Sequence, residues 1–307
     1  MDLSLLADPV FLAQNVVDGA ARGALYAVYA LGFTLIFGVL DIINLAHAAT
    51  FMWCAFAGWL VLSAGLSLPL GLAAALVAGA ATAVLLELLA FRPLRRAGSD
   101  RLASMISSIG ATLIMVSIAE AVFGVSTRRF PDSALDPRPF FLGGAGGLRV
   151  SRAQILIVAA AVVLSLALGF FIRRTRMGTA LRAVAADQRA SRLLGIEVNR
   201  VVVVTFAVAG ALAGAAGILV GLLTNAISPG MGSQIELRGL AVVILGGMGS
   251  IEGAVLGGLI LGLVETFAIA YIPGGGDIKD AIAFIILFLI LLVRPNGILG
   301  RKAEDAA

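Results

Sequence analysis

Long apolar runs alternate along the chain with short charged segments. Three of these runs, residues 70–86, 155–172 and 201–235, contain no Asp, Glu, Lys or Arg. A helix needs about 20 mostly apolar residues to cross the hydrocarbon core of a bilayer. The pattern therefore predicts an all-α membrane protein that crosses the bilayer many times.

The same pattern, followed along the whole chain, predicts nine helices. They cover residues 11–37, 50–66, 70–89, 102–123, 155–172, 201–223, 237–245, 251–271 and 281–293. The seventh is too short to cross a bilayer alone and ends in Gly-Gly-Met-Gly-Ser, which indicates half of a broken helix or a re-entrant segment. We expect a polytopic helix bundle of about 8–9 spans, formed by residues 1–307 as a single transmembrane domain.

Two interruptions rich in small and polar residues lie in comparable places in the two halves of the chain. They are residues 38–51, GVLDIINLAHAATF, and residues 246–258, GGMGSIEGAVLGG. Paired breaks of this kind are typical of transporters built from inverted repeats, in which discontinuous helices meet at a central site. Glycine-rich breaks can also arise separately, so an inverted repeat and two independent breaks both stay open.

Glycine is abundant, at 37 residues, and several glycines lie four positions apart within apolar runs. Gly210 with Gly214, and Gly253 with Gly257, are two such pairs. Lipid gives helices little hydrophobic reason to associate, so membrane helices pack through small residues that let their backbones approach closely. These four glycines therefore indicate helix–helix contacts rather than a ligand site.

Composition narrows the classes of function. Only 13% of the residues are charged and mean hydropathy is +1.06, whereas soluble domains carry about 25% charged residues. The net charge of +4 comes from basic segments between spans, which favour anionic lipid headgroups over nucleic acid as a partner. The single cysteine excludes an internal disulfide and the single histidine a multi-histidine metal site, so we expect neither metal nor cofactor.

Sequence signatures of common enzymes are missing. The chain contains no G-x-x-x-x-G-K-[ST] phosphate-binding loop and no G-x-S-x-G nucleophile motif. Residues 274–277, GGGD, match one element of intramembrane aspartyl proteases, but the Tyr-Asp pair that a two-aspartate mechanism also needs is not present. We therefore expect a protein that is not an enzyme.

Basic residues in the connecting segments predict the orientation of the chain. Residues 92–101 have a net charge of +3 and residues 173–200 a net charge of +5, and the tail after residue 293 adds three more basic residues. Cytoplasmic loops are enriched in Lys and Arg, so all three segments are cytoplasmic if the N-terminus is outside. Residues 126–152, also +3, oppose this assignment. Three segments outweigh one, and we expect a cytoplasmic C-terminus.

The segment with the highest net charge has the pattern of two short helices. Leu181, Val184 and Ala185 form one apolar stripe at helical spacing. Asp187 is placed to cap a following helix, and Gly195 is placed to end it. Two helices with an apolar face and an arginine-rich face can lie on lipid headgroups or dock into a groove of a soluble partner.

Within this segment, AADQRASRLLGI resembles the cytoplasmic coupling segment of ABC importer permeases, whose short helix sits in the ATPase subunit. The wider stretch RRTRMGTALRAVAADQRASRLLGIEVNRV is similar to branched-chain amino acid permeases of the LivH type. Three other blocks resemble that family in the same order: YAVYALGFTLIFGVLDIINLAHAATFMW, VILGGMGSIEGAVLGGLILGLVE and RPNGILG. The departures from the family pattern are Arg22, Leu45, Ala48 and Glu252, and they leave the exact substrate open.

The resemblance implies a permease subunit of an ABC importer in a bacterial inner membrane. Such a subunit moves branched-chain or similar hydrophobic amino acids inward, using ATP that two partner ATPase subunits hydrolyse. A second, LivM-like permease and an extracytoplasmic substrate-binding protein would complete the importer. Residues 173–200 become the cytoplasmic coupling loop, in which the resemblance implies coupling roles for Ala186, Asp187, Ala190 and Gly195.

Asp41, Asn44 and His47 are candidates for the substrate pathway. They lie three residues apart, so on a continuous helix they would share about 120° of one face. Ionisable residues that face the interior of a membrane bundle are candidates for a pathway or gate. The alternative is that this break lies at the cytoplasmic interface, where Asp and His are simply hydrated.

Glu265 is the most isolated charge within an apolar helix, in the sequence GLVETFAIAY. A buried carboxylate in a membrane is costly, so this one should be protonated or paired. A structural pair with Arg22 or Arg238 fits the sequence as well as a transport role does.

Several other functions share some of these features. Permeases for urea or short-chain amides resemble the same family blocks, and sugar permeases share the coupling segment. A secondary transporter would need coupling-ion groups, for which Asp41 and Glu265 are the candidates. A membrane scaffold is a further alternative, but it explains neither the broken helices nor the coupling segment.

Overall fold

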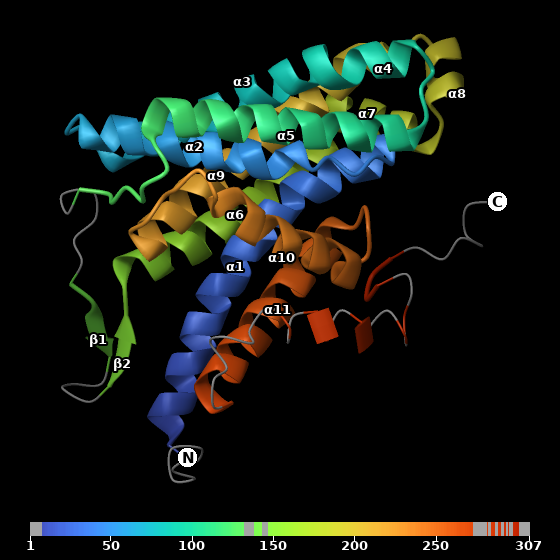
Figure 1. Cartoon of the computed structure of the whole chain (residues 1–307). Coiled ribbons are helices and arrows are strands. Elements are labelled where there is room, and N and C mark those ends of the chain that lie inside the picture. The colour runs from blue at the N-terminus through green and yellow to red at the C-terminus, as the bar shows by residue number, and fades with distance from the viewer. Residues whose placement is uncertain are drawn as a thin grey trace.

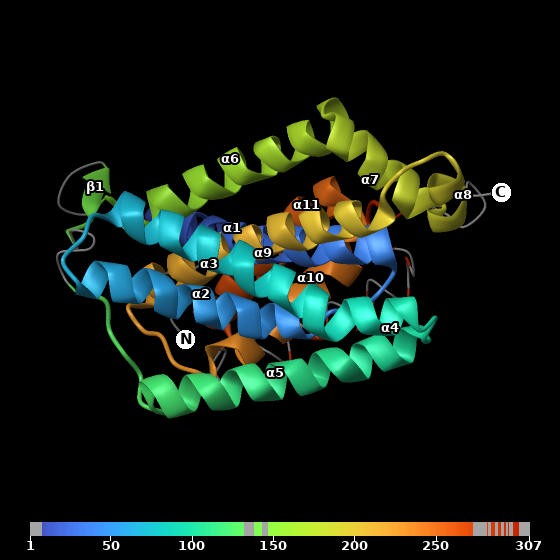
Figure 2. The ribbon, with the colours of Figure 1, turned by 90° about the horizontal axis from the view of Figure 1, so that it is seen from above.

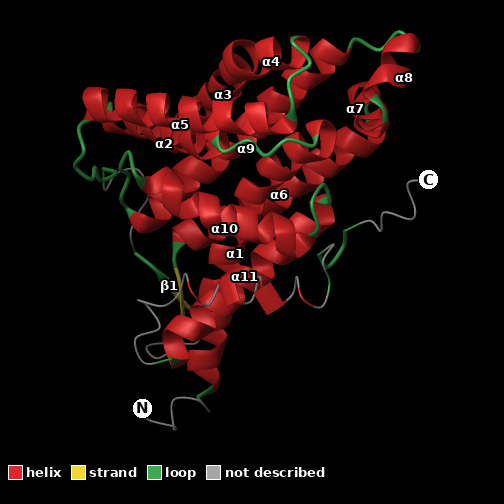
Figure 3. Cartoon of the chain, turned by 45° about the vertical axis from the view of Figure 1, so that its right-hand side comes forward, coloured by secondary structure: helices red, strands yellow, loops and turns green. Residues whose placement is uncertain are grey.

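The computed structural model describes residues 8–131, 138–142 and 147–272, together with single positions between 281 and 300. Its elements are α1 (Pro9–Leu40), α2 (Ala46–Ser63), α3 (Leu68–Leu86), a π-helix (Glu87–Phe91), α4 (Arg92–Arg96), α5 (Arg101–Phe123), β1 (Phe140–Leu142), β2 (Leu148–Val150), α6 (Arg152–Arg174), α7 (Arg176–Ala186), α8 (Gln188–Leu193), α9 (Val198–Thr224), α10 (Met231–Gly246) and α11 (Ile251–Tyr271). Figure 3 shows that helices make up almost all of the described chain. The exception is the short antiparallel hairpin of β1 and β2.

Seven helices in the described part of the chain are long and apolar enough to cross a bilayer. They are α1, α2, α3 with its extension through α4, α5, α6, α9 and α11. Helix α10 has 16 residues, or roughly 24 Å of helix, which is shorter than the hydrocarbon core. The expected polytopic all-α bundle with a broken or re-entrant segment is confirmed. The helix expected at residues 281–293 lies largely outside the described residues.

Most helices begin and end close to the expected residues, with two informative differences. Helix α10 begins at Met231 rather than at residue 237, because the polar residues before Leu237 continue the helix. The third helix continues past residue 89 through one π-helical turn into α4. Pro93 has no N–H to donate to the preceding turn, and the wider π-turn accommodates this loss without ending the helix.

Helix α1 is the central helix of the bundle. Of its most apolar 18-residue window, 89% is buried, compared with 17% for α5 and 11% for α6. Figure 2 shows α5 and α6 on opposite flanks of the molecule. The side chains exposed there are mainly large and apolar, such as Leu113 and Ile114 on α5 and Leu166 and Phe170 on α6. These two flanks have the surface that lipid requires.

Helix α11 lies along α1 (Figure 1) and packs against it through glycines. A Cβ added at Gly23 of α1 would lie 2.7 Å from the Cα of Leu259 and 2.8 Å from the carbonyl oxygen of Gly258. Carbon atoms do not approach backbone so closely, so only glycine permits this crossing. Close backbone approach of this kind is how helices associate in lipid.

The four glycines singled out in the sequence lie at helix crossings. Gly210 and Gly214 face the backbone of α3, and Gly253 and Gly257 face the backbone of α10. A Cβ at Gly257, for example, would lie 2.7 Å from the carbonyl oxygen of Val242. These positions hold the pairs α3–α9 and α10–α11 together at short range.

The two interruptions predicted from the sequence touch each other. A Cβ at Gly38, near the end of α1, would lie 3.4 Å from the Cα of Gly249, in the turn between α10 and α11. That turn needs glycine, because Gly247 and Gly249 have φ values of 101° and 86°. The structure thus joins the ends of the two broken regions at one end of the bundle.

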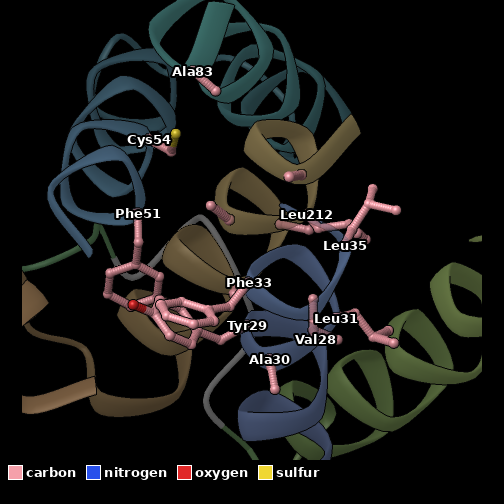
Figure 4. Close-up of a cluster of buried hydrophobic side chains, with 14 of the residues drawn as sticks. Val28, Tyr29, Ala30, Leu31, Phe33, Leu35, Phe51, Cys54, Ala83 and Leu212 are labelled. Carbon is pink, nitrogen blue, oxygen red and sulfur yellow. The ribbon is translucent and has the colours of Figure 1, made fainter. Parts of the chain in front are cut away.

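The hydrophobic core lies between α1, α2, α3 and α9 (Figure 4). Tyr29 and Phe33 of α1 lie beside Phe51 of α2 in this core. Cys54, a buried free thiol, occupies the contact between α2 and α3, close to Gly79. The Tyr29 and Phe33 rings contact His47, one of the candidate pathway residues described next.

Candidate translocation site and coupling loop

The coupling loop folds as the sequence indicates. Asp187 ends α7 and caps α8, accepting hydrogen bonds from the backbone N–H groups of Arg189 at 2.6 Å and Ala190 at 3.0 Å. The Ala190 and Arg189 N–H groups hold the pKa of the Asp187 carboxyl below its usual range. Gly195 follows the last turn of α8 with φ +82°, a left-handed conformation that glycine adopts without strain. The two predicted short helices are confirmed.

The two faces of this helix pair differ in burial. Leu181 and Val184 are buried against the rest of the protein, whereas Ala185 of the expected stripe is exposed. On α8 and the turn after it, Leu193 is 89% exposed and Leu194 is 80% exposed. Two fully exposed leucines at the tip of a basic loop form an apolar spot of the kind that marks a protein contact.

An open cleft of about 630 Å³ lies between this tip and the start of α4. Arg92, Arg192 and Arg200 line it together with Glu197, so its charge is positive. Arginine side chains in this arrangement suit anionic groups, either lipid headgroups or acidic side chains of a partner.

A buried carboxylate anchors the same end of the bundle. Glu87, in the π-helical turn, is 0% exposed and forms ion pairs with Arg95 at 2.7 Å and Arg92 at 3.0 Å. Arg95 also donates a hydrogen bond to the side chain of Asn199 on α9 at 3.0 Å. This network connects the α3–α4 helix to the segment that carries the coupling loop.

The single helical face expected for Asp41, Asn44 and His47 does not form. The chain leaves α1 at Asp41, which adopts a left-handed conformation with φ +53°, and it resumes a helix only at Ala46. The Asn44 side chain accepts a hydrogen bond from the Ala46 N–H at 3.1 Å and so begins α2. The structure places the three residues at the interruption predicted for residues 38–51, where Asn44 satisfies a backbone group instead of continuing the helix.

Asp41 and His47 occupy different environments as a result. The Asp41 side chain is half-exposed and forms an ion pair with Arg101 at the start of α5. His47 is 1% exposed, and its ring centroid lies 4.9 Å from that of Tyr29 and 6.1 Å from that of Phe33. Its Nε2 has no hydrogen-bond partner. Among the described residues, no group of three His, Cys, Asp or Glu could bind a metal beside it.

Glu265 lies in an ion-paired network. It is 2% exposed, and its Oε2 accepts a hydrogen bond from the Tyr26 hydroxyl at 2.6 Å. Its Oε1 lies 3.7 Å from a guanidinium nitrogen of Arg238 and 4.0 Å from one of Arg22. Both partners considered from the sequence are therefore present, and the network joins α1, α10 and α11.

Glu236, a partly exposed residue with one buried carboxylate oxygen, is a further group that the sequence did not single out. It lies on α10 between Gly232 and Gly239, and its Oε1 is buried without a hydrogen-bond partner. In the sequence Glu236 follows an uncharged run and precedes Arg238 by two residues. A charged pair at such a place suggests a helix end exposed to water. The sequence marks Glu236 only through Gly232, four residues before it, and Gly239, three residues after it. These two glycines place it on a helix face that can pack closely.

A family model described as the permease component of branched-chain amino acid transport systems matches residues 15–291. The chain belongs to this family. The resemblance found from the four sequence blocks is confirmed. The family provides the membrane component of ABC transporters, and its membership therefore implies ATPase partner subunits.

Curated relatives match over nearly the whole chain. The high-affinity branched-chain amino acid transport permease BraD of Pseudomonas aeruginosa is 36% identical over 303 residues, or 95% of this chain and 97% of that protein. The corresponding LivH of Escherichia coli strain K12 is 33% identical over 307 residues, or 96% and 98%. These relatives are transport permeases rather than enzymes. With the seven apolar helices, they support a multi-pass protein of the inner membrane.

Two more distant similarities complete the comparison. The ribose import permease RbsC of Escherichia coli strain K12 is 33% identical over 110 residues, which is 34% of each protein. Among solved structures, a metal-chelate type ABC transporter in an inward-facing conformation matches with a TM-score of 0.47 and 17% identity. That match covers 96% of this chain and 91% of the other.

Proposed function

We propose that this chain is the permease subunit of an ABC importer that moves branched-chain or similar hydrophobic amino acids across the inner membrane. The observation that carries the proposal is the near full-length similarity to BraD and LivH, which are permeases for these substrates. ATP is hydrolysed by partner subunits, because the chain has no phosphate-binding loop of its own.

The coupling loop transmits movement between the ATPase and the permease. Asp187 and Gly195 fix the start and end of α8, while Ala186 and Ala190 are small and exposed, so they allow a partner to approach closely. The exposed Leu193 gives the docking contact its apolar centre.

The complete importer in this proposal has two ATPase subunits, a second LivM-like permease and an extracytoplasmic substrate-binding protein. Membrane lipid covers α5 and α6. The N-terminus lies outside and the C-terminus in the cytoplasm, because the basic segments at residues 92–101 and 173–200 both lie at the coupling-loop end of the bundle, where their side chains line one cleft.

Of the pathway candidates, His47 fits a pathway role best. It is buried in the core of the bundle and keeps one unpartnered nitrogen. Asp41 and Asn44 shape the break before α2, so they act on the pathway through backbone geometry. Glu265 acts as a structural anchor between helices.

Uptake of labelled leucine, isoleucine, valine, urea and ribose tests this function, in cells with and without the gene. We expect cells without the gene to lose uptake of the three amino acids and to keep uptake of urea and ribose. Loss of urea or ribose uptake instead would assign the importer to that substrate. Uptake should also stop when ATP is depleted and persist when an uncoupler is added while ATP is maintained. The reverse result would indicate a secondary transporter.

A further inference from the structure

Three buried polar atoms without hydrogen-bond partners lie on α1, α2 and α10, where these three helices pack together. They are the Tyr29 hydroxyl, Nε2 of His47 and Oε1 of Glu236, which we call the α10 cluster. Given the proposed function, we propose that the α10 cluster binds the charged backbone groups of the amino acid in transit. Glu236 and Nε2 of His47 bind the α-ammonium group, and the Tyr29 hydroxyl binds the α-carboxylate.

The packing of α10 directs Glu236 toward the other two residues. Gly232, Glu236 and Gly239 are spaced i, i+4 and i+7, so they share one face of the helix. A Cβ at Gly232 would lie 2.7 Å from the carbonyl oxygen of Ala48, the residue after His47, and a Cβ at Gly239 would collide with the Tyr29 ring. Glu236 therefore lies between the α2 contact and the α1 contact, on the face of α10 that packs against Tyr29.

The polar atoms of the α10 cluster are free to bind a ligand, because the described part of the protein gives them no hydrogen-bond partner. Tyr29 is 0% exposed and His47 is 1% exposed, yet neither the hydroxyl nor Nε2 has a hydrogen-bond partner. Buried polar atoms are almost always hydrogen-bonded, and a buried carboxylate oxygen is especially costly to leave unpaired. Glu265, by contrast, has its buried carboxylate satisfied by Tyr26 and by two arginines. The paired carboxylate of Glu265 is therefore structural, whereas the unpaired oxygen of Glu236 is available to a substrate.

The depth of the cluster fits a pathway through the membrane. Tyr29 lies about three helical turns before the end of α1 at Leu40, well inside the length of that spanning helix. His47 packs against Gly32, which lies one helical turn from Tyr29 on α1. The segment between α1 and α2 therefore turns back into the bundle, and α2 begins at this depth. The first turns of α2 and α10 meet there, and helix N-termini favour a carboxylate.

The exposed side of α10 gives the cluster access to the pathway. Ser233 and Gln234 are exposed on this helix, whereas the surfaces of α5 and α6 are predominantly apolar. Polar side chains at membrane depth belong beside water or protein rather than lipid. This face of α10 therefore lines the path that the substrate follows.

The chemistry of the cluster selects among the candidate substrates. An amino acid zwitterion supplies an ammonium group for the Glu236 carboxylate and the His47 Nε2 acceptor, and a carboxylate for the Tyr29 hydroxyl donor. The rings of Phe33 and Phe51, which pack around the His47 and Tyr29 rings, offer apolar surface to a branched side chain. Urea and ribose carry no charge, so they would leave the Glu236 carboxylate uncompensated.

The test uses the complete importer, reconstituted in lipid vesicles with its partner subunits and a leucine-loaded binding protein. The variants are Glu236→Gln and Tyr29→Phe, with Glu120→Gln on the exposed surface of α5 as the matched control. We expect leucine transport to fall about tenfold or more in Glu236→Gln, because a charge-assisted hydrogen bond is lost. Tyr29→Phe should show a smaller loss, and Glu236→Asp should recover part of the wild-type rate.

ATP hydrolysis measured in the same vesicles separates binding from folding. Stimulated hydrolysis should stay within about twofold of wild type in every variant, because the site lies away from the coupling loop. Unchanged leucine transport in Glu236→Gln would overturn the inference, as would a parallel loss of transport, hydrolysis and assembled complex. If the wild-type importer moves no branched-chain amino acid, the proposed function fails and the inference with it. Normal wild-type transport with an unaffected Glu236→Gln variant refutes the inference alone.

Discussion

At Gly195, a single added side chain should impair the coupling of ATP hydrolysis to transport without preventing folding. Its φ of +82° is costly for a β-branched residue, by about 1–2 kcal/mol, and it directs the chain from α8 back into α9. We predict that Gly195→Val reduces ATP-driven uptake several-fold while the importer still assembles, because α8 loses its fixed end. Uptake and stimulated ATP hydrolysis in purified importer check this prediction.

Gly98 provides the matched control for that variant. It also has a positive φ, +68°, and open space around it, and it lies in the turn between α4 and α5. Gly98→Val imposes a comparable local strain away from α8, so it should leave coupling close to wild type. Equal coupling in the two variants would show that the end of α8 is not important for transmission.

Glycine contacts between α9 and α3 set the stability of the bundle. A Cβ at Gly210 would overlap the carbonyl oxygen of Gly79 and the Cβ of Ala83. We predict that Gly210→Ala lowers the unfolding temperature of the purified protein, since overpacking typically costs about 1–3 kcal/mol. Thermal unfolding in detergent measures the effect.

Gly169 on α6 is the control for packing. Nothing lies within 4 Å of a Cβ at this position. Gly169→Ala should therefore be neutral or should stabilise the helix by up to about 1 kcal/mol, because alanine restricts the unfolded chain. A similar destabilisation in both variants would argue that helix propensity, and not the α9–α3 contact, determines the result.

The helices and the coupling loop could be predicted because their signals are local. Apolar run length fixed the spans, and the capping residue Asp187 with the stop at Gly195 fixed α8 to the residue. A break was predicted within residues 38–51, but the residue at which α1 ends could not be predicted in the same way. Whether Asp41 continues a helix depends on tertiary partners such as Arg101, which lies on another element.

The α10 cluster also could not be predicted from local sequence, because its residues come from segments far apart in the chain. His47 was identified because a histidine in an apolar chain stands out, but Glu236 was not. Its significance depends on α10 packing against α1 and α2 at Gly239 and Gly232, contacts between segments far apart in the sequence. Glu265 was recognised as needing a partner, and only the fold could show that Arg22 and Arg238 both approach it.

At the scale of the whole molecule, buried helices form a centre that two lipid-facing helices flank. The network of Glu265 joins α1, α10 and α11, while that of Glu87 connects the α3–α4 helix to α9 at the end that carries residues 173–200. The coupling loop follows α6 and leads directly into α9, which packs against α1, α2 and α3. A displacement of α8 by a partner can therefore reach the helices that surround the α10 cluster through packed contacts.

The orientation of this assembly gives a prediction that the single cysteine makes easy to test. Ser67 and Ser99 are both exposed, and they flank the continuous helix Leu68–Arg96, so they lie on opposite sides of the membrane. With the N-terminus outside, Ser67→Cys should react with a membrane-impermeant maleimide in intact cells. Ser99→Cys should react only after the membrane is permeabilised.

The native Cys54 serves as the internal control, since it is 0% exposed and packs against α3, so the unmodified protein should not be labelled. The basic loops at residues 92–101 and 173–200 favour this orientation, whereas residues 126–152 oppose it. The labelling pattern therefore decides between two conflicting charge signals. Labelling of Ser99→Cys in intact cells would place the coupling loop outside, away from any ATPase, and would refute the importer assignment together with the topology.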